Sequence, residues 1–415
     1  MASIYVSNIE GTYLDLHRPA LIIGGCFALV AVALSLFLIL QHLRSYTNPE
    51  EQKWVVAVIF MVPAYATQSV FSLWNPNLSL ACDTLKSCYE AFALYSFGRY
   101  LVACLGGERR VVEFLENESQ KKLSKPLVEG KDESRGVRQR SFVNFFLRPS
   151  ALGSGLFAVE RFGLVQYMIL KTVCAFLAFI LTLFGVYGDG EFNWHYGYPY
   201  IALVLNFSQM WALYCLVQFY NVTHENLKPI KPLAKFVSFK AIVFATWWQG
   251  VGIALMCAFG LPSDEGRFQT ALQDFLICIE MAIAAVAHVF VFSVEPYQFV
   301  PASEYGEVTC ERTTAEFKLK EGDEEKPAAL EKEDVQFEAP GTNVTDSFHD
   351  IVVQGGQSKL IFGDVVLTIN QAVGPVEKGV TKIQETFHQR MVDSKDAEES
   401  EIVVDEHVEE ESSVR

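Results

Sequence analysis

The strongest constraint on the fold is a series of seven mostly apolar stretches, each long enough for a helix to cross a bilayer. A hydrocarbon core about 30 Å thick needs roughly 20 consecutive apolar residues in a helix. The third and seventh stretches carry charges and could instead form a buried helical hairpin, but their length and the alternating loops favour spans. We therefore predict an all-α polytopic membrane protein with seven transmembrane helices, at about 19–40, 54–73, 82–105, 164–187, 197–219, 236–259 and 271–294.

Charge divides the chain of 415 residues where the last stretch ends. Residues 1–295 carry 22 basic and 22 acidic side chains, whereas residues 296–415 carry 11 and 27, so the net charge of −16 lies entirely in the tail. Hydrophobic residues make up 51% of the chain, which argues against a purely soluble enzyme. These patterns predict a leader at 1–18, a transmembrane domain at 19–295 with a long loop at 106–161, and an acidic tail.

Lys and Arg are concentrated in alternate loops. Sixteen lie in 41–53, 106–161 and 220–235, whereas only Arg18 and Arg267 lie on the opposite side. Loops retained in the cytosol carry the excess of these residues. We therefore predict an N-terminus outside and a cytosolic tail. The first stretch has neither a basic leader nor a convincing cleavage site, so we expect a span rather than a cleaved signal peptide.

The segments outside the spans are mostly polar. The start of the long loop, at 106–123, is either a short amphipathic helix along the membrane surface or an ordinary solvated loop. Acidic runs cannot bury enough apolar surface to fold, so we expect disorder over about 305–345 and beyond 394. Between these runs, apolar residues recur at helical spacing, which predicts a helix at about 375–392.

The sequence lacks the motifs that mark a catalytic, cofactor or metal site. It has no P-loop, no zinc-protease or nucleophile-elbow motif and no cluster of Cys and His at metal-binding spacing. A balanced body with an acidic tail also argues against a nucleic-acid partner. We therefore predict that the protein is not an enzyme and needs no cofactor or metal.

Polar residues follow one face of the seventh stretch. At about 100° per residue, Gln269, Gln273, Glu280, His288 and Glu295 fall within one sector. Ionisable residues inside a span are costly and usually face the bundle interior or water. The pattern is typical of the wall of an aqueous cavity, in which His288 could exchange protons with Glu280. Hydrogen bonds from these groups to neighbouring helices are the alternative.

Polar side chains of several stretches are predicted at a similar depth, about 8 to 18 Å from the outer surface. Sites of transporters tend to lie at such depths. We therefore predict a ligand cavity lined by Glu90, Asn206, Gln209, Gln249, Glu280 and His288. Its two carboxylates would repel an anionic solute unless one is protonated or paired with a cation, so we expect a neutral or cationic solute, or proton coupling.

Three segments in order resemble one known family: CYEAFALYSFGRYL (88–101), NLKPIKPLAKFVSFKAIVFATWWQG (226–250) and LQDFLICIEMAIAAVAH (272–288). They are similar to the organic solute transporter alpha-subunit and transmembrane protein 184 superfamily over about 20–300. The length and acidic tail resemble its plant Lazarus-one-like branch. The resemblance implies seven helices, transport of amphipathic organic solutes such as steroid conjugates, and, in plants, vacuolar or plasma membranes and programmed cell death.

These observations together predict an integral membrane, transporter-like protein that binds or moves a small amphipathic organic solute. Expected partners are membrane lipids, the solute, and either a second copy of the chain or a cytosolic protein bound through the tail. A seven-span ligand-sensing receptor and a scaffold acting through its tail are the alternatives, because the same layout serves all three.

Overall fold

The computed structural model describes residues 2–124, 153–188, 193–258, 267–301, 336–338, 342–351 and 358–373. The chain falls into two compact units that divide after Gln357. The first unit holds a bundle of long helices, and the second holds a helix over 358–373. The helix predicted at 375–392 lies outside the described residues.

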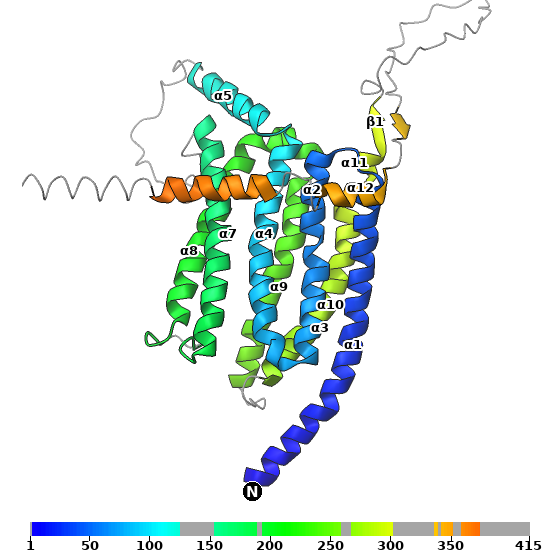
Figure 1. Ribbon diagram of the computed structural model, residues 1–415, viewed down its shortest axis with the longest axis vertical. Helices are drawn as coiled ribbons and strands as arrows, with labels where there is room; N and C mark the ends of the chain where they lie inside the picture. The colour runs from blue at the N-terminus through cyan, green and yellow to red at the C-terminus, as the bar shows by residue number, and fades with distance from the viewer. Residues whose placement is uncertain are drawn as a thin grey trace, which may run out of the picture. The chain divides into compact units, whose positions relative to one another are not determined.

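The long helices of the first unit run side by side (Figure 1). Among the described residues, six segments are long and apolar enough to cross a membrane: His17–Arg44, Pro49–Trp74, Ser154–Leu183, Tyr198–Ile230, Pro232–Ile253 and Gln269–Val291. The protein is therefore a polytopic integral membrane protein. Its long elements are α1 (Ala2–Arg44), α2 (Pro49–Ile59), α3 (Met61–Trp74), α4 (Ser79–Cys104), α7 (Ser154–Leu183), α8 (Tyr198–Leu227), α9 (Pro232–Ala258) and α10 (Arg267–Val291).

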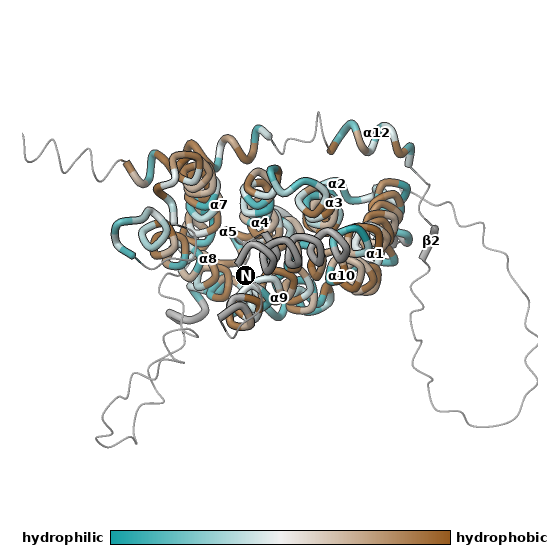
Figure 2. Tube along the Cα trace, turned by 90° about the horizontal axis from the view of Figure 1, so that it is seen from below, coloured by the Kyte–Doolittle hydropathy of each residue, from teal (hydrophilic) through white to brown (hydrophobic). Residues whose placement is uncertain are grey.

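Helix α4 corresponds to the predicted third span but is not among the six. Its 26 residues are enough to cross a bilayer, yet they include Asp83, Lys86, Glu90 and Arg99. Seen along the helices, α4 lies between α7 on one side and α3 on the other, with α9 nearby (Figure 2). Charged residues in membrane helices favour such an enclosed position. Lys86, Glu90 and Arg99 thus lie in the interior of the bundle, whereas Asp83 near the start of α4 is exposed.

The outward faces of the other long helices are apolar. Phe207 on α8 is 75% exposed and Phe290 on α10 is 78% exposed. Contiguous exposed apolar surface of this kind marks a membrane or protein contact. Because these helices also have membrane-spanning length, we assign their outward faces to lipid.

Close helix contacts depend on two glycines. A Cβ atom on Gly98 of α4 would collide with Leu164 Cδ1 of α7, and one on Gly163 of α7 would lie 2.7 Å from Cys215 Sγ of α8. Small residues let membrane helices approach closely. These two positions therefore set the spacing of α4, α7 and α8.

Short elements gather at the end of the bundle where α1 finishes (Figure 1). They are α5 (Glu108–Ser124), η2 (Lys228–Ile230), α11 (Glu295–Gln298), β1 (Phe299–Pro301), β2 (Gln336–Glu338) and α12 (Val344–His349). A further short helix, η1 (Pro76–Leu78), joins α3 to α4 at the opposite end. The strands β1 and β2 pair antiparallel. The first part of the long loop is thus a helix, α5, whose first residue Glu108 accepts a hydrogen bond from Arg99 at 2.7 Å.

Two short pieces of the segment over which disorder is expected, 336–338 and 342–345, are described, and the rest of 305–345 lies outside the described residues. β2 gains backbone partners from β1, and Thr342 docks on the last turn of α1. The Thr342 hydroxyl donates to the carbonyl of Leu43 at 2.8 Å, and its backbone N–H donates to that of Arg44 at 2.9 Å. Carbonyls at the end of a helix lack partners within the helix. The tail supplies those partners to α1.

A tyrosine just beyond α1 adds a second contact to the tail. The Tyr46 hydroxyl donates to Asp350 Oδ2 at 3.0 Å. Burial and the neighbouring Asp350 carboxylate raise the pKa of this hydroxyl well above its ordinary range, so it remains a donor. Residues 342–351 are therefore fastened to the end of α1 at two points.

Candidate functional site

The bundle encloses a group of charges around Glu90. Lys171 of α7 lies 3.4 Å from Glu90 Oε2, and Lys240 of α9 lies 3.3 Å from Glu90 Oε1. The Tyr167 hydroxyl of α7 also donates to Oε1, at 3.2 Å. Glu90 lies eleven residues along α4, about 16 Å from its start. We call these four residues the Glu90 cluster, and it lies at middle depth in the bundle.

The Glu90 cluster carries more positive than negative charge. One carboxylate faces two ammonium groups, and the side chains of Glu90, Lys171 and Lys240 are only 8%, 17% and 13% exposed. Buried charges need partners of opposite sign because desolvation is expensive. Glu90 neutralises one lysine and leaves one positive charge over. The cluster is therefore suited to an anionic group, which would supply the missing counter-charge.

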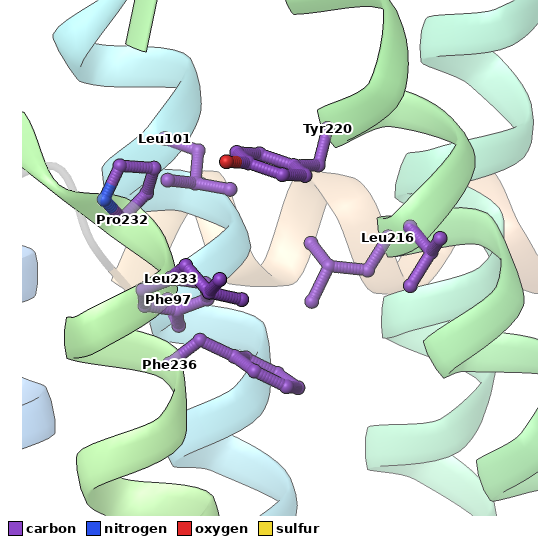
Figure 3. A pocket seen from close by; sticks show the side chains of 8 residues that line it. Phe97, Leu101, Leu216, Tyr220, Pro232, Leu233 and Phe236 are labelled. Atoms are coloured by element: carbon purple, nitrogen blue, oxygen red, sulfur yellow. The ribbon is translucent and has the colours of Figure 1, made fainter. Parts of the chain in front are cut away.

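An apolar pocket of about 390 Å³, including its open mouth, lies between α4, α8 and α9 (Figure 3). Its lining is aliphatic and aromatic except for the Tyr220 hydroxyl: Phe97, Leu101, Leu216, Val217, Tyr220, Pro232, Leu233 and Phe236. Leu233 is 59% exposed and Val217 is 39% exposed, whereas Leu216 is 4% exposed. The pocket thus opens to the outside of the bundle between α8 and α9 and closes toward α4.

The pocket and the Glu90 cluster share two helices and lie along the same faces. Phe97 follows Glu90 by seven residues, two turns of α4, and Phe236 precedes Lys240 by four residues, one turn of α9. Residues at these spacings lie one above another on a helix. An apolar surface and a cationic surface are therefore stacked along the bundle, an arrangement that matches an amphipathic anion.

The predicted cavity residues fall into separate places. Gln249 of α9 donates a short hydrogen bond to Glu280 Oε1 of α10, so the structure brings these two together. His288 is 1% exposed and packs edge-on against Phe292 with ring centroids 5.0 Å apart. Within the described part of the chain, neither ring nitrogen of His288 has a hydrogen-bond partner. Glu280 and His288 lie eight residues apart on α10, and their role in binding stays a prediction.

Neither fifth-span candidate belongs to the Glu90 cluster. Asn206 is exposed, and its amide donates to the carbonyl of Ala202 in its own helix at 2.8 Å. Gln209 is half-buried. The structure therefore places Glu90 with lysines rather than with these amides. A common depth predicts which residues share a layer, but not which helix faces meet.

Four interior charged residues escaped the sequence prediction. They are Lys171 and Lys240 of the Glu90 cluster, and Lys86 and Asp274, which form an ion pair at 2.8 Å between α4 and α10. Each lies inside or near a predicted span, and a buried charge normally has a partner. A search of the sequence for a basic partner to Glu90 within the spans would therefore have pointed to the two lysines of the Glu90 cluster. A carboxylate at the site repels an anionic solute unless a cation is paired with it. At Glu90, two lysines supply that pairing.

Among the described residues, no group of three or more His, Cys, Asp or Glu side chains is placed to hold a metal ion. Seven cysteines are free thiols: Cys26, Cys82, Cys88, Cys104, Cys174, Cys215 and Cys278.

Residues 20–297 match the family described as organic solute transporter Ostalpha. Protein LAZ1 homolog 2 of Arabidopsis thaliana is 66% identical over 392 residues, covering 94% of this chain and 95% of the relative. Protein LAZ1 of the same plant is 46% identical over 380 residues, covering 88% and 77%. No solved structure matches the chain.

Proposed function

Because the chain belongs to the organic solute transporter Ostalpha family, we propose that it carries an amphipathic organic anion across a membrane. The anionic group binds at Lys171 and Lys240, and the apolar body binds in the pocket beside Phe97 and Phe236. The observation that carries the proposal is the surplus positive charge of the Glu90 cluster. Steroid conjugates are the solute class that the sequence resemblance suggests.

The surplus charge also favours an anionic solute over a neutral or cationic one. A neutral or cationic solute would leave one buried ammonium without a counter-charge, at a free-energy cost that an anion removes. An anion therefore fits the Glu90 cluster better than the neutral or cationic solute expected from the carboxylates alone.

The proposal also includes a seven-span topology, in which α4 is the third span. It further includes a location in the vacuolar or plasma membrane and a link to programmed cell death.

Sensing through the tail is the second candidate. It draws support from Thr342, which ties the tail to the last turn of α1 and could report a movement of that helix to a cytosolic partner. Deleting residues 336–415 separates the two functions. Transport predicts that solute flux survives the deletion, and sensing predicts that the cellular response is lost while solute binding persists.

The transport proposal is tested by uptake of a radiolabelled steroid sulfate into proteoliposomes that contain the purified full chain. Lys240→Met removes the surplus charge, so the concentration for half-maximal uptake should rise about tenfold, as expected for the loss of one charge-assisted contact. Lys228→Met is the matched control, because Lys228 is exposed on η2 and should leave uptake unchanged.

The pocket is tested separately. Leu216→Trp fills the closed end of the apolar pocket, so uptake of the steroid sulfate should fall while uptake of a small aliphatic sulfate is retained. Uptake by the parent that is no faster than in protein-free vesicles would contradict the transport proposal.

A further inference from the structure

A nearly uncharged, apolar segment interrupts the acidic tail. Residues 296–415 carry 27 acidic and 11 basic side chains, yet residues 351–376 include only one of each, Asp364 and Lys359. Most of this segment forms the helix at 358–373. The two charges cancel, so the helix is not repelled from an anionic surface as the rest of the tail is.

The helix at 358–373 is amphipathic. At about 100° per residue, its apolar side chains other than Leu360 and Leu367 fall within a sector of about 140°, which only Ser358 in the first position interrupts. A sector of this width is typical of a helix that lies on a continuous apolar surface. The members of the sector are Ile361, Phe362, Val365, Val366, Ile369, Ala372 and Val373.

One side of this helix is covered, and part of its apolar sector is exposed. Asp364 is 5% exposed and Thr368 is 3% exposed. In contrast, Phe362, Val366, Ile369 and Val373 are 70%, 39%, 46% and 52% exposed. These four residues follow one another at steps of 4, 3 and 4, so they form one stripe along the helix, which we call the Phe362 stripe.

Chain length limits how far the helix can lie from the membrane surface. The membrane-spanning segment of α1 ends at Arg44, and Asp350 accepts a hydrogen bond from Tyr46 just beyond that end. Asp350 precedes Ser358 by eight residues, and a fully extended chain of that length spans at most about 29 Å. The helix itself is about 24 Å long. A lipid surface therefore lies within reach of the Phe362 stripe.

A coiled coil with a second copy of the chain is a poorer match to the stripe. Steps of 4, 3 and 4 also occur in heptad repeats, but the Phe362 stripe covers fewer than two heptads, and a coiled coil needs about three to four. The apolar spacing resumes at Val376, yet Gly374 and Pro375 stand between. Proline lacks the backbone donor and clashes with the preceding turn, so it interrupts a continuous helical seam.

We propose that the helix at 358–373 lies on the membrane surface, with the Phe362 stripe inserted among the lipid acyl chains. Removing these exposed apolar side chains from water drives the contact. Amphipathic helices bind bilayers in this orientation. Because Lys359 and Asp364 cancel, the contact depends on apolar insertion rather than on anionic headgroups. It holds the acidic tail at the bilayer, whatever solute the protein carries.

The test uses the full chain in lipid nanodiscs, with the photoreactive amino acid p-benzoylphenylalanine at one position at a time. In place of Phe362 or Ile369, it should form adducts with radiolabelled phosphatidylcholine on illumination. Gln371 is the matched control, because it is exposed on the opposite side of the same helix. Its adduct yield should be about tenfold lower, since that side stays in water. Phe290, 78% exposed on α10, is the positive control.

Two further comparisons separate apolar insertion from attraction between charges. Replacing about one third of the phosphatidylcholine by phosphatidylserine should change the total lipid adduct at Phe362 less than about twofold, because the helix has no net charge. Ile369→Glu should lower that yield about tenfold, because it places a carboxylate among the acyl chains. Gln371→Glu adds the same charge on the opposite side and should leave the yield unchanged.

The crosslinked products also identify the other possible occupants of the stripe. Covalent dimers formed from Ile369 would assign the Phe362 stripe to a second copy, and crosslinks within one chain would assign it to the protein itself. Either result in place of lipid adducts would overturn the proposal. Equal lipid adducts at Phe362, Ile369 and Gln371 would also overturn it, as would their absence at Phe362 and Ile369 in nanodiscs where Phe290 forms them.

Discussion

Glu90 keeps its charge inside the bundle because two lysines from other helices surround it. The sequence was sufficient to predict Glu90 as an interior candidate from its depth in the third stretch. It was not sufficient to predict that Lys171 and Lys240 face it, because that depends on how α7 and α9 are rotated about their axes. Asn206 shows the same limit, since it shares the predicted depth and yet bonds within its own helix.

The ion pairs at Glu90 predict that removing the carboxylate destabilises the bundle more than removing one of the two ammonium groups. Glu90→Gln leaves Lys171 and Lys240 facing each other without a carboxylate, and breaking a buried charge pair in this way costs about 3 kcal/mol. Adding Lys240→Met removes one of the stranded ammonium groups, so the double variant should recover most of that loss. The midpoint of thermal unfolding in detergent, followed by Trp fluorescence, measures both effects.

Lys240→Met alone serves as the control for that cycle. It leaves the ion pair of Glu90 with Lys171, so it should destabilise the bundle less than Glu90→Gln does. A Glu90→Gln variant that melts at the same temperature as the parent would show that Glu90 is not held as an ionised partner of the two lysines.

At the scale of the elements, the apolar stretches of the sequence predict which segments form the long helices. They do not predict the residues at which those helices begin and end. Helix α7 starts at Ser154 rather than near 164, because its first turns contain Glu160 and Arg161, which lower the hydropathy without ending the helix. The paired strand β2 was missed for a different reason. Its partner β1 lies more than 30 residues earlier, and pairing between distant segments leaves no local pattern in the sequence.

The contact between α7 and α8 predicts a sharp dependence on residue size. A Cβ on Gly163 would lie 2.9 Å from Cys215 Cβ, an atom fixed to the backbone of α8, so Gly163→Ala must push the helices apart. Overpacking of this kind costs about 1–3 kcal/mol and should lower the thermal midpoint in detergent. Gly98→Ala meets the flexible end of Leu164 instead and should cost less.

A compensating change tests whether the effect comes from this contact. Cys215→Gly removes the clashing Cβ, so the double variant Gly163→Ala, Cys215→Gly should melt at a higher temperature than Gly163→Ala alone. Equal midpoints for the two would mean that the destabilisation arises elsewhere.

For the whole molecule, hydropathy was sufficient to predict a membrane protein. It predicted seven spans, whereas six of the described segments are long and apolar enough to cross a membrane. The difference lies in α4, which the sequence counts as a span on length and which the structure shows as an enclosed helix with four charged residues. The pairing of interior charges is a property of the assembled bundle. It arises from ion pairs that join α4 to α7, α9 and α10, and no single stretch displays it.

The orientation of the bundle is a final prediction at this scale. Sixteen basic residues in alternate loops against two on the other side predict a cytosolic tail. In the structure α5, α11 and α12 lie at the end of the bundle where α1 finishes, opposite the N-terminus (Figure 1). Because Thr342 binds the last turn of α1, the tail leaves the bundle from that same end. An epitope placed after Arg415 should therefore be accessible to protease added to the cytosolic face of sealed vesicles, whereas an epitope before Met1 should be protected until detergent is added. The reverse pattern of protection would contradict the predicted orientation.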